Sequence, residues 1–100
     1  MIRLEFHPEA LAEYEYAARH YANIQVGLGI RFVSTVESAL ESILGTPETW
    51  PALEQDVRRR LVRVFPYAIL YSIESDHILV LAEMHCHQQP GYWRARAPSN

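Results

Sequence analysis

The chain has 100 residues, of which 49% are hydrophobic and 21% charged, a balance typical of one globular domain. Its single cysteine, Cys86, cannot form an internal disulfide. No stretch approaches the roughly 20 apolar residues of a membrane-spanning helix, and MIRLEFHPEA lacks the apolar run of a signal peptide. We therefore expect a single cytoplasmic domain over residues 1–100, without membrane association.

Charge is unevenly distributed along the chain. Residues 1–56 carry nine acidic and three basic side chains, whereas residues 57–100 carry three acidic and six basic ones. All nine basic residues are arginine, which suits bidentate pairing with carboxylate or phosphate. The positive charge therefore belongs to the second half, within an overall net charge of −3.

The first half predicts a strand followed by two helices. Residues 2–6 alternate apolar and charged side chains, as a half-buried strand does. Pro8 favours a first helical turn, and the helix that follows is expected to end near Asn23. A second helix is expected from about residue 25 to residue 44, with Gly45 as a left-handed terminator. Helices joined so closely must lie nearly antiparallel.

The second half predicts strands. After a loop over residues 46–56, we expect strands over Arg58–Phe65, Tyr67–Glu74 and Ile78–His85. The run ILVLAEM is apolar on both faces, which indicates a strand covered on both sides. The predicted fold is α+β: an N-terminal strand, an antiparallel two-helix hairpin, and a three-stranded antiparallel meander, with the helices packed on one face of the sheet.

Residue types that bind metals or act as nucleophiles are sparse. In a strand, His85 and His87 face one side and Cys86 faces the other, so the three cannot share one ion. Cys86 itself reads as an inert buried thiol. Because no glycine-rich nucleotide-binding motif or GxSxG motif occurs either, we expect no metal and no cofactor.

One basic and aromatic constellation stands out. Arginines lie in the first strand of the predicted meander, and His, Tyr, Trp and Arg side chains lie at and after the end of the last strand. Because antiparallel strands bring such ends together, we expect both sets to line one surface. These residues are Arg58, Arg59, Arg60 and Arg63, then His85, His87, Tyr92, Trp93, Arg94 and Arg96. Such types suit RNA cleavage through the 2′-hydroxyl. The alternative, which pattern alone favours, is a solvated or salt-bridged arginine edge with Tyr92 and Trp93 packed over the end of the sheet.

Taken together, four segments resemble the RelE/ParE toxin superfamily over about residues 2–96. They are FHPEALAEYEYAARHY, GIRFVSTVESALESIL with GTPETWP, RRRLVRVFPYAILYSI, and ILVLAEMHCHQQPGYWRAR. The resemblance implies the fold predicted above and the toxin of a type II toxin-antitoxin system, as in plasmid stabilisation. It also implies a cognate antitoxin as partner, in a toxin-antitoxin hetero-oligomer.

The resemblance offers two cellular targets. RelE-like members cut mRNA on the ribosome, whereas ParE-like members inhibit DNA gyrase and lack the catalytic set. This chain has Ala68 about where nuclease members place an arginine, it has no lysine, and Gln88 and Gln89 stand where an arginine often follows the histidines. These departures favour the ParE-like branch and a protein that is not an enzyme.

Three functions follow from this comparison. The first is gyrase inhibition through target-binding residues Arg58, Arg59, Arg60, Tyr92, Trp93, Arg94 and Arg96. The second is a ribosome-dependent endoribonuclease in which His87 and Tyr92 act as acid and base and Arg63 stabilises the phosphate. The third is a toxin fold that has lost its toxicity.

Overall fold

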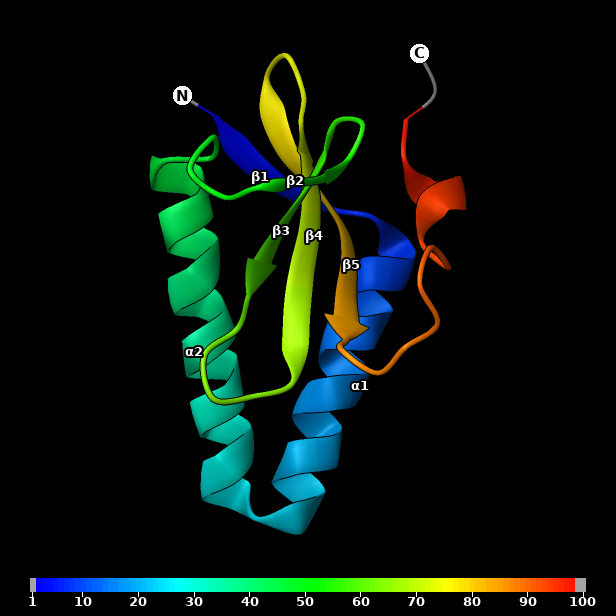
Figure 1. The fold of residues 1–100 in the computed structure, drawn as a ribbon. Coiled ribbons are helices and arrows are strands. Elements are labelled where there is room, and N and C mark those ends of the chain that lie inside the picture. The colour runs from blue at the N-terminus through cyan, green and yellow to red at the C-terminus, as the bar shows by residue number, and fades with distance from the viewer. Residues whose placement is uncertain (1, 99–100) are drawn as a thin grey trace.

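Two helices cover one face of a five-stranded mixed sheet in the computed structural model, which describes residues 2–98 (Figure 1). The strand order is β1-β5-β4-β3-β2. The elements are β1 (Arg3–Phe6), α1 (Pro8–Ile24), α2 (Val26–Gly45), β2 (Ala52–Glu54), β3 (Val57–Leu61), β4 (Tyr67–Ile73), β5 (His77–His85) and the 3-10 helix η1 (Arg94–Arg96). The α+β prediction, with both helices on one face, is confirmed.

The N-terminal strand takes an edge position that the sequence did not predict. β1 runs parallel to β5, with Arg3 opposite His77 and Phe6 opposite Val80. The chain then turns into α1, where His7 is the N-cap and its Nδ1 accepts a hydrogen bond from the backbone N–H of Glu9 at 3.2 Å. A parallel edge strand makes the sheet mixed, and the three later strands form the expected antiparallel meander.

The two helices form a tight hairpin. Only Gln25, in extended conformation, separates them. A Cβ placed on Gly29 would lie 2.7 Å from the Cβ of Ala22, so glycine at this position permits the close approach of α2 to α1. Gly45 is the last residue of α2 and is not left-handed as predicted, because Thr46 ends the helix and its hydroxyl donates to the carbonyl of Ser42. Within residues 2–98, neither helix is sufficiently long and apolar to cross a membrane.

The strands differ from prediction mainly around β3. The predicted loop contains a short strand, β2, which pairs with the start of β3 through a register shift. β3 ends at Leu61 rather than at residue 65, and the chain turns toward β4 over residues 62–66, where Val64 adopts a φ of 75°, a conformation that a β-branched residue rarely takes. β4 and β5 match the predicted strands to within one residue at each end.

Side chains pack on both faces of the sheet. The larger core lies between the helices and the sheet and includes Phe32, Phe65, Tyr67 and Tyr71. A second, smaller core lies on the opposite face, where the C-terminal tail brings Trp93 against Leu70, Leu81 and neighbouring side chains. β5 is therefore covered on both faces, as its apolar run predicted.

Candidate functional site

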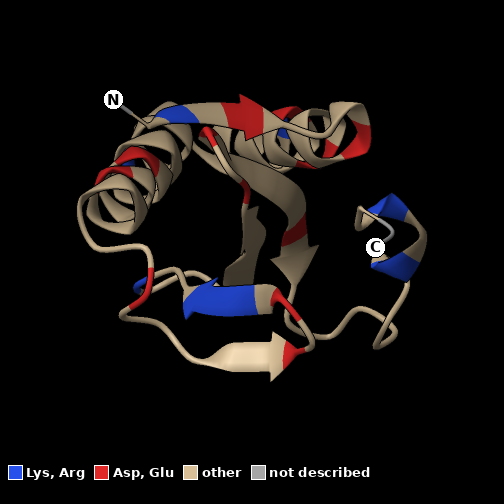
Figure 2. Cartoon of the chain, turned by 90° about the horizontal axis from the view of Figure 1, so that it is seen from above, with Lys and Arg blue, Asp and Glu red and all other residues tan. Residues whose placement is uncertain are grey.

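The arginines of β3 do not share one surface. Successive side chains of a strand point to opposite faces. Arg58 and Arg60 point to the helix side: Arg58 donates to the carbonyls of Glu48 (3.1 Å) and Trp50 (2.7 Å), and Arg60 donates from Nε to the Ser42 hydroxyl at 2.8 Å. Arg59 lines a hollow on the opposite face with Trp93 and Arg94. The predicted single surface is wrong, because only Arg59 of the β3 arginines lies with the tail, whose ribbon runs apart from that of β3 in Figure 2.

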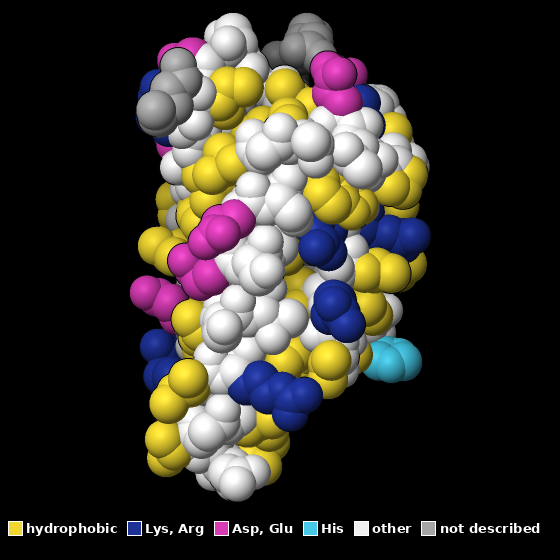
Figure 3. All heavy atoms as spheres, turned by 90° about the vertical axis from the view of Figure 1, so that its left-hand side faces the viewer, with side chains coloured by type: hydrophobic (Ala, Val, Ile, Leu, Met, Phe, Trp, Pro, Cys, Tyr) yellow, Lys and Arg dark blue, Asp and Glu magenta, His cyan; other side chains and the backbone are white. Residues whose placement is uncertain are grey.

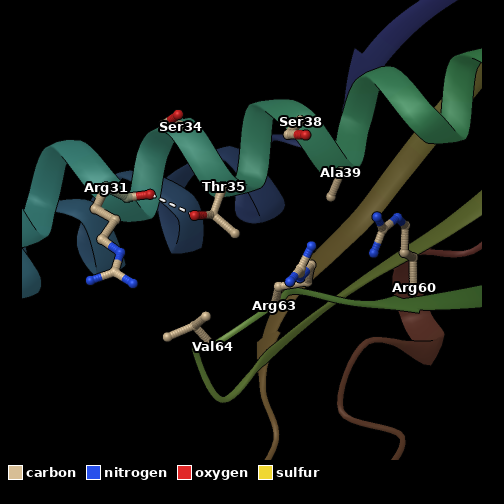
Figure 4. Close-up of a pocket in the computed structure, with 8 residues that line it drawn as sticks. All are labelled: Arg31, Ser34, Thr35, Ser38, Ala39, Arg60, Arg63 and Val64. Atoms are coloured by element: carbon tan, nitrogen blue, oxygen red, sulfur yellow. Dashed lines mark hydrogen bonds between the residues drawn. The ribbon is translucent and has the colours of Figure 1, made fainter.

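A groove between α2 and the end of β3 gathers three of the arginines (Figure 4). Arg31 reaches it from α2, whereas Arg60 and Arg63 reach it from the strand side. Its volume is about 310 Å³, and the remaining lining residues are Ser34, Thr35, Ser38, Ala39 and Val64. We call this feature the arginine groove.

The arginine groove holds unneutralised positive charge. Across the described part of the chain, Arg31 and Arg63 form no ion pair, and the guanidinium of Arg60 binds only a hydroxyl and a carbonyl while lying 4.9 Å from the Trp50 ring centroid. Several basic side chains gather in the middle of the face shown in Figure 3, to the right of a row of carboxylates. Like charges brought together without a counter-ion attract anionic groups, so the arginine groove suits an acidic partner.

Strain accompanies the arginine groove. Val64 forms part of its lining, has a φ of 75° and is 77% exposed. A β-branched residue held in the left-handed region costs of order 1–3 kcal/mol, and such strain clusters at functional sites. The strained turn between β3 and β4 therefore adds a second, independent sign that this end of the molecule is a site.

The C-terminal tail is fixed to the sheet by an arginine and a tryptophan. Arg94 pairs with Glu54 of β2 through Nε (2.7 Å) and a second nitrogen (2.9 Å), although its side chain is 61% exposed. Trp93 is 2% exposed and packs in the second core. Trp93 therefore packs over the sheet, as the alternative of a salt-bridged arginine edge predicted. In this conformation its side chain is not available to a partner.

Arg96 ties the tail to α1. Its guanidinium donates to both carboxylate oxygens of Glu13 at 3.0 and 2.9 Å and to the carbonyl of Leu81 at 3.0 Å, and its side chain is only 9% exposed. The same guanidinium lies 5.0 Å from the ring centroid of Tyr92. Burial and the neighbouring Glu13 raise the pKa of the Tyr92 hydroxyl. Tyr92 therefore has a structural partnership and is a poor proton donor or acceptor at neutral pH.

Two histidines lie together at the end of β5, His85 as its last residue and His87 just beyond it. The ring of His85 is 5.1 Å from that of Tyr67 and 5.2 Å from that of His87, and the backbone N–H of His87 donates to Nδ1 of His85. Cys86 is exposed rather than buried as expected, because β5 ends one residue before it. Across residues 2–98, no three His, Cys, Asp or Glu side chains are arranged to hold a metal ion.

The three nuclease candidates do not meet in one pocket. Arg63 lines the arginine groove beside α2, whereas Tyr92 lines a separate pocket beside α1 and the end of β5. His87 is exposed beyond the end of β5 and lines neither of these two pockets. Neither of these two pockets is therefore lined by all three candidates.

Two residues of these sites were missed from the sequence. Arg31 stands on the exposed face of a helix, with no motif around it. Glu83 lies inside the apolar strand β5, buried beside the pocket of Tyr92. The sequence did offer a sign of Glu83, because it is the only carboxylate in the apolar run ILVLAEM.

Comparison with solved structures identifies a similar fold. The fold matches a solved structure described as the chromosomal ParDE TA system from P. aeruginosa, with a TM-score of 0.59 and 17% identity over 82% of this chain and 92% of that chain. No curated protein matches the chain.

The family follows from the sequence comparison. A family model described as "ParE toxin of type II toxin-antitoxin system, parDE" matches residues 4–90. The chain belongs to this family of ParE toxins, as the resemblance predicted. Membership implies an antitoxin as partner.

Proposed function

We propose that this toxin acts by binding and inhibiting DNA gyrase. The observation that carries the proposal is the separation of the residues that RNA cleavage would require: Arg63 belongs to the arginine groove, and Tyr92 is tied to Glu13 and Arg96 beside α1. General acid–base catalysis needs its groups within hydrogen-bond reach of one reacting atom. A toxin without that arrangement works by occupying its target.

The contact surface in this proposal is the arginine groove. Arg31, Arg60 and Arg63 offer guanidinium groups that have no carboxylate partner within the described residues, next to the exposed Val64. Arginine anchors beside apolar side chains are typical of the energetic centre of a protein interface. An acidic surface of gyrase is the partner that this charge pattern fits.

A ribosome-dependent endoribonuclease is the second candidate. It is favoured by the grouping of His85, His87 and Tyr67 at the end of β5, where centroid separations of 5.1 and 5.2 Å bring rings suited to proton transfer together. In that case His87 and Tyr92 would act as acid and base and Arg63 would bind the phosphate, after the tail and the β3–β4 turn had rearranged.

Two assays on the purified protein separate the candidates. Gyrase supercoiling of relaxed plasmid is expected to be inhibited in a dose-dependent way, and primer extension on ribosome-bound mRNA is expected to show no new ends. Cuts that His87→Ala abolishes, with supercoiling untouched, would reverse the assignment. Induction without the partner gene is expected to stop growth, and normal growth under strong expression would favour a toxin that has lost its toxicity.

The antitoxin is proposed to dock on the helical hairpin. Near its tip the two helices form an apolar groove of about 420 Å³, in which Val26 and Ile30 are exposed. An amphipathic helix of the antitoxin fits such a groove. Ile30→Asp is expected to weaken the complex with the product of the adjacent antitoxin gene. Leu53→Asp, an equally polar change at β2, is expected to leave the complex intact. Equal effects of the two variants would argue against this docking mode.

A further inference from the structure

Glu83 is a buried carboxylate that the fold leaves unpartnered. It is 2% exposed, and both of its carboxylate oxygens are shielded from solvent without a hydrogen-bond partner within the described residues. Burial, together with the nearby carboxylates of Glu13 and Glu37, raises its pKa to about 8. A buried carboxyl without a hydrogen-bond partner lowers the stability of the fold. Its presence calls for a role outside folding.

A pocket of about 610 Å³ adjoins this carboxyl group, between α1 and the end of β5. Glu83 and Glu13 supply carboxylates to its lining, and Tyr16, Tyr67 and Tyr92 supply aromatic rings. The other lining residues are Ala12, Arg19, His85 and Gln88. We call this feature the acidic pocket. Carboxylates surrounded by tyrosine rings are the chemistry that recognises an organic cation.

The chain already uses this chemistry once, at the edge of the acidic pocket. The guanidinium of Arg96 is held by the carboxylate of Glu13 at 2.9 and 3.0 Å and lies 5.0 Å from the ring centroid of Tyr92. Glu13 is thereby neutralised. Glu83 is the second carboxylate of the same pocket and has no such partner.

We propose that the acidic pocket binds an arginine side chain presented by a protein partner, with Glu83 as its counter-ion and the tyrosines as its walls. Arginine fits better than lysine because a planar guanidinium pairs bidentately with a carboxylate and stacks on aromatic rings. Tyr16 and Gln88 line the acidic pocket and are exposed, so the proposal requires side chains at this exposed end to move before an arginine reaches the covered carboxyl group.

The charged and titratable groups around Glu83 define how binding depends on pH. They are Glu13, Tyr14, Tyr16 and Arg19 from α1, Glu37 from α2, Tyr67 from β4, His85 from β5, and Tyr92 and Arg96 from the tail. Glu13 is paired with Arg96, and Glu37 accepts from the hydroxyl of Tyr14 at 3.1 Å. A cation that enters must therefore ionise Glu83, and it displaces a proton in doing so.

The test uses small probes on the full chain. N-acetyl-arginine methylamide is titrated into the isotope-labelled protein and followed by amide chemical shifts, with the neutral isostere N-acetyl-citrulline methylamide and the lysine analogue as comparisons. Saturable binding in the millimolar range is expected for arginine, with shifts confined to residues around the acidic pocket. The citrulline probe is expected not to bind, and the lysine probe to bind several-fold more weakly.

Two variants make the assignment specific to Glu83. Glu83→Gln is expected to weaken arginine binding at least about tenfold, and Glu15→Gln, on the exposed face of α1, is expected to leave it unchanged. Between pH 6 and 8 the wild-type Kd is expected to fall by up to about tenfold per pH unit, with no such slope in Glu83→Gln.

Several results would overturn the proposal. They are the absence of saturable binding, equal binding of arginine and citrulline or of arginine and lysine, and an unchanged Kd in Glu83→Gln. Gyrase inhibition by Glu83→Gln is expected to equal that of the wild type, so the two proposals fail independently.

Discussion

Replacing Glu83 by glutamine is expected to stabilise the folded protein in a pH-dependent way. The carboxyl group has a pKa of about 8 in the folded chain, against 4.5 for an unperturbed glutamate. Between these values the unfolded chain has lost a proton that the folded chain retains. Stability therefore falls as pH rises from about 4.5 to about 8, and it changes no further above that range through this group.

The size of the effect follows from this window. Over the pH range in which only the folded chain keeps this proton, the free energy of unfolding falls by about 1.4 kcal/mol per pH unit. At pH 7 the ionisable group thus costs the fold on the order of 3 kcal/mol relative to pH 4.5, a large share of the stability of a small domain. Glutamine buries an amide instead, whose cost does not depend on pH.

Urea denaturation of the wild type and Glu83→Gln at several values between pH 5 and 9 measures the effect. The stability difference in favour of the variant is expected to grow from pH 5 to about 8 and then to level off. Glu15→Gln is the control and is expected to show no growing difference. A difference that stays constant with pH would refute the assignment of a raised pKa to Glu83.

Three further substitutions, two of them paired with a comparison variant, test how the tail and the hairpin are held. Arg96→Ala is expected to cost about 2 kcal/mol in urea denaturation because it leaves a half-buried carboxylate without a partner, and Arg94→Ala is expected to cost much less; equal losses would contradict the burial argument. Gly29→Ala is expected to lower the thermal midpoint, because its Cβ would clash with Ala22 of α1. Gly27→Ala, whose Cβ would meet nothing within 4 Å, is expected to raise the midpoint. A rise in both variants would exclude the close approach of α2 to α1 at Gly29. Trp93→Ala is expected to destabilise by about 3–5 kcal/mol in the same measurement, and a loss below about 1 kcal/mol would mean that the second core contributes little.

The fold was largely predictable because hydrophobic periodicity marks its main elements. Both helices, β4 and β5 follow from spacings of three and four and from apolar runs bounded by turn residues. β2 was not predicted, because a strand of three residues is too short to show an alternation of apolar and polar side chains. The parallel pairing of β1 with β5 depends on how the hairpin packs, which local sequence does not encode.

The candidate site was less predictable, since it depends on which way side chains point. Arg58, Arg59 and Arg60 are adjacent in sequence, but strand alternation sends the middle one to the opposite face. Arg31 completes the arginine groove from a helix far away in the sequence, so only the tertiary structure brings it near Arg63.

The most direct test of the proposed mode of action is the dose response of gyrase supercoiling to arginine variants. Arg31→Ser/Arg63→Ser removes two charges from the arginine groove, and Arg3→Ser/Arg19→Ser removes two exposed charges elsewhere. Inhibition is expected to weaken at least about tenfold in the first variant and to stay within about twofold of the wild type in the second. Equal inhibition by the two variants would contradict a gyrase contact through the arginine groove.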